Sequence, residues 1–363
     1  MPTISSFVFA ALLTLGSVAE VPQPQPSQHT GRIVVETIRA TTLQDTVTGE
    51  DPDRTVAVYL PPAYFTETDR RFPTLYLLHG IGDTQTVWTS GWFQPGDPWS
   101  TIDGLFDRGI SGGWLRQMIV VMPDQRTLAG GSFYTDSSVT GRWQEFTARE
   151  LPAWIDGRFR TLASAESRGV AGHSMGGYGA IMLAMKYPET FSAAYGMSPA
   201  LLGWGGDVTG ENPAFRSLPS REGWQDLRGF FERGFVVVAQ AFSPNPDKPP
   251  FFADLPFSAD DEGAMVATEP AHARWQSHLP IHLVERYRDN LLKLRGLRFD
   301  AGTADQFSHI PQTSRELSQR LTDLQIPHVF EQYNGDHRNR LWGRSGRLYT
   351  EVLPWFSLLL ESE

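Results

Sequence analysis

Short apolar runs alternate with longer amphipathic stretches along most of this chain. The apolar runs are typical of strands and lie at Thr55–Leu60, Thr74–Leu78, Met118–Met122, Ser167–Ala171, Phe191–Tyr195, Leu297–Phe299 and His328–Gln332. The longer stretches favour helices at Gln144–Phe159, Gly177–Lys186, Gln312–Leu324 and Leu348–Leu360. Strands that alternate with helices predict an α/β fold, with a mostly parallel central sheet and helices on both faces.

One part of the chain departs from this alternation. Residues 201–290 are rich in Gly, Pro and Trp, and they include the stretch NPDKPPFFADLPF at Asn245–Phe257. We expect this segment to be an insertion over the carboxyl edge of the sheet, where it forms a cap that shapes a pocket.

The first residues form an apolar run that ends in Ser17-Val18-Ala19. Small residues at these positions suit signal-peptidase cleavage after Ala19, which predicts a signal peptide over residues 1–19 and a secreted or periplasmic protein. The run is too short to span a membrane. Since it carries no Lys or Arg, a buried N-terminal helix is the alternative. Residues 20–31 alternate Pro and Gln, as in an extended spacer, so the folded domain is expected over residues 32–363.

Composition and charge exclude several classes of function. The formal net charge of −10 opposes binding to nucleic acid or to an anionic membrane surface. The chain has no cysteine, which excludes disulfides, a cysteine nucleophile and a cysteine metal site. It contains no HExxH zinc motif, no phosphate-binding GxxxxGK[ST] loop and no dinucleotide fingerprint. We therefore expect neither a metal nor another cofactor, and no feature of the sequence predicts an oligomeric state.

The motif Gly172-His173-Ser174-Met175-Gly176 fits the pattern G-x-S-x-G. It follows a predicted strand and opens a predicted helix, which is the context of a nucleophile elbow. An elbow holds its serine in a strained conformation, and small residues on both sides let the strand and the helix approach each other. We therefore predict that Ser174 is a catalytic nucleophile.

A serine nucleophile needs a histidine base and an acid that orients the base. His337 lies in a turn directly after the last predicted strand, whereas His328 lies at the start of that strand and His309 begins a helix. His337 is therefore the predicted base. Asp305, in the loop after Leu297–Phe299, is the predicted acid.

Two other carboxylates remain alternatives to Asp305. Asp300 lies at the end of the strand, where it would tie down the loop. Asp336 is adjacent to His337, and the side chains of neighbouring residues usually diverge.

An oxyanion hole would use the backbone N–H that follows the nucleophile and a second N–H from the loop after an early strand. Met175 provides the first. The loop Leu78-His79-Gly80-Ile81-Gly82-Asp83 provides the second, and we expect it from Ile81.

Four more residues are candidates for contact with a substrate: Gly80, Trp88, Asp124 and Trp342. Each has a structural alternative. Gly80 could simply end a strand, the two tryptophans could be buried in the core, and Asp124 could anchor a loop.

Several segments resemble, in the same order, those of the esterase D-like family: FPTLYLLHGIGD, VVMPD, GGSFYTDS, GHSMGGYGAIMLAMKYPE, FSAAYGMSPAL and NGDHRNRLW. That family includes S-formylglutathione hydrolases, tributyrin and feruloyl esterases, and secreted mycolyltransferases. The resemblance covers roughly Thr55–Ala200 and Leu294–Trp342. It implies an α/β-hydrolase fold, a triad of Ser174, Asp305 and His337, oxyanion donors at Ile81 and Met175, and acyl transfer through an acyl-enzyme.

The chain departs from the family in one position near the base. Many members have an aromatic residue two positions after the histidine, where this chain has Asn339, although Trp342 three positions further on is retained. The resemblance therefore does not define the wall of the acyl pocket, while the triad is unaffected. The formylglutathione branch is cytosolic, so the predicted signal peptide opposes that substrate.

The sequence thus predicts a serine carboxylesterase that acts on a small-molecule or carbohydrate-linked ester. A first alternative is an acyltransferase that passes the acyl group to a sugar or lipid alcohol. A second is a non-catalytic binding module that retains a hydrolase fold.

Overall fold

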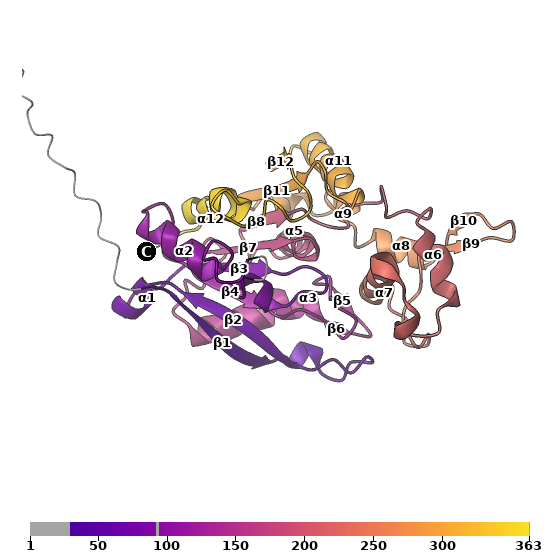
Figure 1. Cartoon of the computed structure of the whole chain (residues 1–363), viewed down its shortest axis with the longest axis horizontal. Helices are drawn as coiled ribbons and strands as arrows, with labels where there is room; N and C mark the ends of the chain where they lie inside the picture. The colour runs from indigo at the N-terminus through magenta and orange to yellow at the C-terminus, as the bar shows by residue number, and fades with distance from the viewer. Residues whose placement is uncertain (1–29, 92–93, 363) are drawn as a thin grey trace, which may run out of the picture.

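A computed structural model describes residues 30–91 and 94–362 of the chain. The predicted signal peptide and nearly all of the predicted spacer lie outside the described residues. The centre of the fold is an eight-stranded sheet in the order β1-β2-β4-β3-β7-β8-β11-β12 (Figure 1). Its strands are β1 (Arg32–Arg39), β2 (Asp53–Leu60), β3 (Thr74–Leu78), β4 (Ile119–Pro123), β7 (Arg168–His173), β8 (Ala193–Met197), β11 (Gly296–Gly302) and β12 (Val329–Tyr333).

The six strands from β4 to β12 run parallel to one another, whereas β2 pairs antiparallel with β4 and β1 pairs antiparallel with β2 at one edge. This confirms the predicted α/β fold with a mostly parallel sheet. Each apolar run of the sequence forms a strand, with ends that differ by at most two residues except in β11, which extends three residues beyond the predicted Leu297–Phe299. The edge strand β1 was not predicted, since most of its side chains are exposed or half-buried and its sequence, RIVVETIR, has no apolar face.

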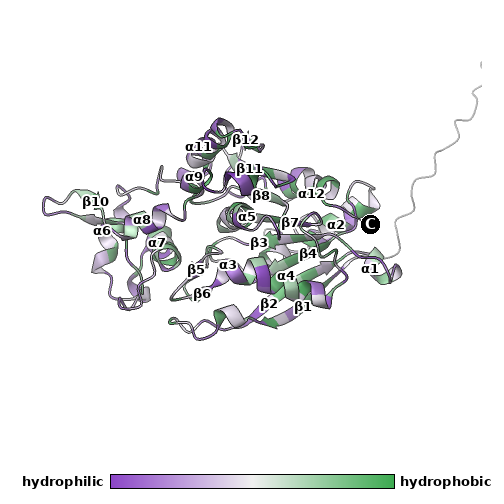
Figure 2. Cartoon of the chain, turned by 180° about the vertical axis from the view of Figure 1, so that it is seen from behind, coloured by the Kyte–Doolittle hydropathy of each residue, from purple (hydrophilic) through white to green (hydrophobic). Residues whose placement is uncertain are grey.

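Helices cover both faces of the sheet. The structure contains α1 (Ala63–Thr66), α2 (Ile102–Ser111), α3 (Trp143–Glu145), α4 (Leu151–Arg158), α5 (Met175–Lys186), α11 (His309–Asp323) and α12 (Leu353–Leu359), with π-helical turns at Phe146–Glu150 and Leu348–Val352. Helices α2 and α12 pack on one face through a cluster that includes Leu75 and Leu77, and α4, α5 and α11 pack on the other with Tyr76 and Leu78. The alternation of β3 residues between the two cores follows from the two-residue period of a strand. In Figure 2 the central strands β3, β4 and β7 are mostly green, as expected for strands buried on both faces.

The segment between β8 and β11 forms a separate layer of short elements. It comprises α6 (Pro213–Ser217), α7 (Gly229–Phe242), α8 (Ala271–Gln276), α9 (Pro280–Leu283), α10 (Arg288–Leu291) and a hairpin of β9 (Phe257–Ala259) and β10 (Met265–Ala267). Aromatic rings hold this layer together, for example Phe215 stacked on Phe235 with 4.1 Å between ring centroids. Figure 1 shows α6, α7, α8 and the hairpin at one end of the molecule, beyond α5 and α9.

No helix within residues 30–91 and 94–362 is both long and apolar enough to cross a bilayer.

Candidate active site

Ser174 lies at a sharp turn between β7 and α5. Its backbone angles are φ 59° and ψ −116°, a region that residues other than glycine rarely adopt. Two glycines make the turn possible. A Cβ on Gly172 would lie 2.3 Å from the Gly176 backbone, and a Cβ on Gly176 would lie 2.1 Å from the carbonyl oxygen of Leu78. Strain of this kind is stored at functional sites, where the surrounding structure maintains it.

His337 and Asp305 form a buried hydrogen-bonded pair at the carboxyl edge of the sheet. Nδ1 of His337 lies 2.7 Å from Oδ2 of Asp305, and the other oxygen of that carboxylate accepts a hydrogen bond from the Phe307 N–H at 2.9 Å. The two side chains are 2% and 0% exposed. With Nδ1–H donated to the carboxylate, the neutral imidazole presents Nε2 as its basic nitrogen.

Burial sets the charge states of this pair. Removal from water lowers the pKa of His337 to about 3, and the nearby Arg338 guanidinium acts in the same direction. Burial also raises the pKa of Asp305 to about 6, against the stabilising hydrogen bond from Phe307. At neutral pH the imidazole is therefore uncharged and the carboxylate largely ionised, which is the combination that a general base requires.

His173 connects the loop of His337 to the serine turn. Its Nε2–H donates to the carbonyl oxygen of His337 at 2.8 Å, and the two rings lie 4.5 Å apart between centroids. Burial lowers the pKa of His173 to about 3, so its ring is neutral and holds a single tautomer. The residue before Ser174 thus positions the backbone that carries the imidazole.

The loop after β3 passes beside Ser174. A Cβ on Gly80 would lie 3.5 Å from Cβ of Ser174. The side chains of Ile81 and Met175 meet over Gly131, whose Cβ would lie 3.4 Å from Cγ1 of Ile81 and 2.6 Å from Sδ of Met175. Among the hydrogen bonds of the loops, turns and caps that the structure describes, the N–H groups of Ile81 and Met175 donate to no other group.

His79 fixes this loop from behind. Its Nδ1–H donates to the Gly80 carbonyl oxygen at 2.8 Å, and its Nε2 accepts the Gln125 N–H at 2.8 Å. Burial lowers the pKa of His79, so the neutral ring keeps one donor and one acceptor nitrogen. This residue therefore ties the loop that carries Ile81 to the end of β4.

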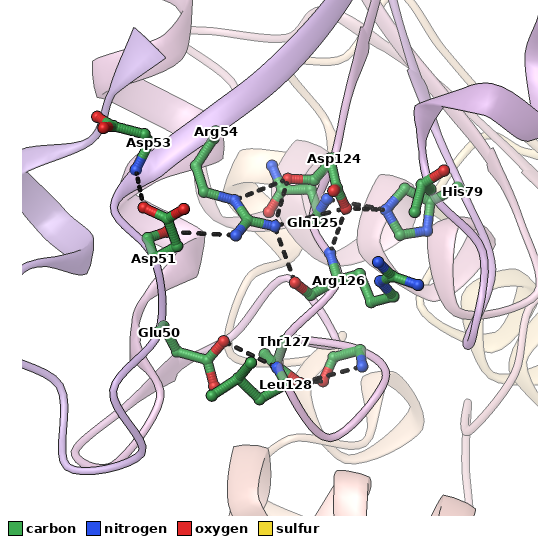
Figure 3. A network of polar contacts seen from close by, with 12 residues as sticks. Glu50, Asp51, Asp53, Arg54, His79, Asp124, Gln125, Arg126, Thr127 and Leu128 are labelled. Carbon is green, nitrogen blue, oxygen red and sulfur yellow. Dashed lines mark hydrogen bonds and ion pairs between the residues drawn. The ribbon is translucent and has the colours of Figure 1, made fainter. Parts of the chain in front are cut away.

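Asp124 belongs to the same polar network, which Figure 3 shows from close by. Its Oδ1 lies 3.4 Å from Nη2 of Arg54 and accepts the Arg126 N–H at 2.9 Å. The Arg54 guanidinium also donates to the carbonyl oxygen of Arg126 at 2.8 Å. These contacts match the structural alternative for Asp124, a loop anchor, and its contact with a substrate stays a prediction.

The two tryptophans predicted near the site contact each other, with ring centroids 5.9 Å apart. Trp88 is 1% exposed and packs in the core beneath α2 and α12, so its ring has no surface left for a ligand. Trp342 is half-buried against the same core. Neither residue lines the cavity beside Ser174 in the described part of the chain.

The alternatives to His337 and Asp305 have other partners. Asp300 is fully buried, accepts from the Tyr195 hydroxyl at 2.9 Å and pairs with Nε of Arg347 at 2.6 Å. His328 pairs with Ser318 at 2.8 Å, while Asp336 accepts the Arg338 N–H at 2.8 Å. All of these contacts serve to hold loops and strands.

A narrow apolar cavity opens beside Ser174, with a volume of about 50 Å³. Ile81, Met175 and Phe133 line it from the sheet, and Phe230, Phe235 and Val238 line it from α7 of the insertion. His309 also lines it, hydrogen-bonded to Asp207 of the insertion, 102 positions away in the sequence. This second His–Asp pair was not predicted, because no local pattern connects two residues so far apart in the sequence.

Groups of acidic and histidine side chains that could hold a metal ion are absent from residues 30–91 and 94–362.

The mostly parallel sheet and the strained serine between its central strand and the following helix define an α/β-hydrolase fold. Two solved structures share it. A ferulic acid esterase superposes with a TM-score of 0.62 at 20% identity, covering 92% of this chain and 100% of that chain. An S-formylglutathione hydrolase from Agrobacterium tumefaciens superposes with a TM-score of 0.58 at 19% identity, covering 92% and 98%. At these identities the likeness establishes the fold alone.

Residues 50–345 match the model of the family described as "Putative esterase", and the chain belongs to that family. The resemblance found in the sequence is thereby confirmed. An esterase from Mycobacterium tuberculosis is 30% identical over 295 residues, which make up 78% of this chain and 52% of the relative. The chain thus spans about half the length of its mycobacterial relatives.

Proposed function

We propose that this protein is a serine carboxylesterase that works through an acyl-enzyme, with Ser174 as nucleophile, His337 as base and Asp305 as the acid that orients the base. The observation that carries the proposal is the buried His337–Asp305 pair, tied by His173 to the strained turn of Ser174. The family membership and the relatives, which include esterases and a xylanase/feruloyl esterase, favour an ester as the substrate.

In the proposed mechanism the Ser174 hydroxyl attacks the ester carbonyl while Nε2 of His337 takes its proton. Asp305 holds Nδ1–H and stabilises the imidazolium that forms. The unused N–H groups of Ile81 and Met175 stabilise the oxyanion, and the N-terminal end of α5 adds its positive dipole. His337 then returns the proton to the leaving alcohol, and later activates the water that releases the acid.

The cavity supports a small substrate group. At about 10–15 Å³ for a single water, a cavity of about 50 Å³ is of a size that suits a short chain. Its lining is almost wholly apolar, which suits a short hydrocarbon chain. We therefore propose short-chain esters as preferred substrates.

The test is Ser174→Ala, assayed with p-nitrophenyl butyrate. We expect kcat to fall by on the order of 10⁴ or more, because the acyl-enzyme can no longer form. A fluorophosphonate probe should add its mass to the wild-type protein and leave the variant unmodified.

Ser192→Ala is the matched control. Ser192 is also buried, and its hydroxyl has no partner in the described structure. It directly precedes β8, at the amino ends of the parallel strands, whereas Ser174 lies at their carboxyl ends. This variant should keep its activity. An active Ser174→Ala enzyme would refute the proposal, and release of an ester instead of the free acid when glycerol is added would point to acyl transfer.

A further inference from the structure

The cavity beside Ser174 contains a polar group that the proposed mechanism does not use. Nδ1 of His309 lies 2.5 Å from Oδ1 of Asp207, and the same carboxylate accepts the N–H groups of His309 and Ser308 at 3.1 and 3.2 Å. Partial burial opposes ionisation of Asp207, but these hydrogen bonds hold the pKa of its carboxyl below the usual value. An ionised carboxylate only accepts, so Nδ1 of His309 carries the hydrogen.

The other ring nitrogen of His309 is consequently an acceptor in the neutral imidazole. The side chain is 7% exposed, and within the described residues its Nε2 has no hydrogen-bond partner. The residues around it in the cavity are mainly Phe, Val and Ile. A buried acceptor without a donor is unfavourable, so this nitrogen is suited to a donor that a ligand brings.

His309 lies close to the residues that the proposed mechanism uses. The Phe307 ring lies 5.0 Å from the His337 ring and 6.4 Å from the His309 ring, between centroids. Both imidazoles therefore lie next to the same phenylalanine, and His309, Phe307 and Ser174 line the same cavity. A short chain of an ester attached to Ser174 would enter the cavity that His309 lines.

We propose that this cavity selects esters whose short chain carries a hydroxyl group, and that Nε2 of His309 accepts the hydrogen bond of that hydroxyl. Asp207 fixes the tautomer that makes Nε2 an acceptor. His309 is then a specificity-determining residue, and the inference rests on the proposed esterase function. A hydroxyl is the donor that fits best, because a charged ammonium group would enter this apolar cavity only at a large desolvation cost.

The experiment compares kcat/KM within two pairs of esters of similar size. Methyl 3-hydroxybutyrate against methyl butyrate places the hydroxyl in the acyl half, and 2-hydroxyethyl butyrate against propyl butyrate places it in the alcohol half. The wild-type enzyme should prefer the hydroxylated member of one pair by about tenfold in kcat/KM. This is the factor expected from the gain of one buried hydrogen bond. The pair that shows the preference identifies the half that the cavity binds.

The variant His309→Phe keeps an aromatic ring and removes the acceptor, so its kcat/KM ratio for that pair should fall to about one. His309→Leu serves the same purpose if the larger ring prevents folding, and circular dichroism checks both. His328→Phe is the control, because His328 lies outside the cavity against Phe299 and Ser318. It should retain the wild-type ratio.

Two outcomes would overturn the inference: equal kcat/KM values within both pairs for the wild-type enzyme, or a preference that survives His309→Phe. Failure of the proposed function would look different, since none of the four esters would then show hydrolysis that depends on Ser174.

Discussion

Buried histidines dominate the site at the scale of single residues. His79, His173 and His337 each lie in the interior, and burial lowers the pKa of all three. A neutral imidazole has one donor and one acceptor nitrogen, and the contacts of His79 use both. Within the described residues, His337 hydrogen-bonds to Asp305 through its donor nitrogen, and in the proposed mechanism Nε2 is the base.

The depressed pKa of His337 predicts the pH dependence of activity. Acid inactivates a general base by protonating it, and burial shifts this protonation below the unperturbed value of 6.5. The acid limb of kcat/KM against pH should therefore have an apparent pKa below 6.5. A limb at or above that value would show that the base is a more exposed group.

Stability must be followed in the same experiment. The folded protein resists protonation of His173 and His337, so the unfolded chain binds more protons below pH 6.5. These two histidines should thus lower the free energy of unfolding as pH falls from 6.5 toward 3, and they outweigh Asp305, whose raised pKa acts in the opposite direction between about 6 and 3.8. Circular dichroism at each pH distinguishes loss of the base from loss of the fold.

Local patterns predicted only part of these residue roles. Ser174 and His337 could be proposed because each follows a recognisable strand, and Asp305 because it follows another. The contacts of His173 with His337 and of His309 with Asp207 join residues 164 and 102 positions apart. They depend on how β7, β12 and the insertion pack, which no short window of sequence contains.

At the scale of elements, the serine turn depends on close contact between β3, β7 and α5. Gly172 contacts Gly176 directly, and Gly176 contacts the carbonyl of Leu78 in β3. The helix therefore begins at Met175, directly after the nucleophile, although its apolar pattern predicted a start at Gly177. Helix α2 was not predicted because it contains Gly104 and Gly109, and glycine is a poor helix former. Close packing explains the first of them. A Cβ on Gly104 would lie 2.0 Å from the Pro98 carbonyl oxygen, so no larger residue fits at this position.

Gly176→Ala should destabilise the protein and abolish its activity. The added methyl would overlap the carbonyl oxygen of Leu78, which cannot move without displacing β3. We expect a loss of about 1–3 kcal/mol in the free energy of unfolding, measured with urea. Gly157→Ala is the control, since it lies on an exposed turn of α4 with no atom within 4 Å of its Cβ. That change should stabilise by up to about 1 kcal/mol, and equal effects of the two substitutions would contradict the role of the contact.

At the scale of the whole molecule, the cavity is a joint product of the sheet and the insertion. Helix α7 of the insertion supplies the outer wall of the cavity beside Ser174. The bounds of the insertion as a separate part of the domain stay a prediction. Residues two positions apart in α7 lie on different faces of the helix: Val238 lines this cavity, while Val236 lines a separate one within the insertion.

This difference predicts the effect of two matched substitutions. Val238→Ala should enlarge the cavity and raise kcat/KM for hexanoate over butyrate p-nitrophenyl esters by about tenfold, as one or two accommodated methylenes provide. Val236→Ala removes the same atoms from an equally buried position, 2% exposed against 3%, and should leave the chain-length profile as in the wild type. Both should cost about 1–3 kcal/mol of stability. Identical profiles for the two variants would show that this cavity does not receive the chain.

The hydrogen bond between His173 and the His337 carbonyl also has a consequence for biosynthesis. It joins the turn of the nucleophile to a loop made 164 residues later, beyond the last strand of the sheet. A chain still emerging from the ribosome carries Ser174 long before it carries its base. Under the proposed mechanism the nascent protein therefore has no esterase activity, and hydrolysis begins only when β12 has docked and the sheet is complete.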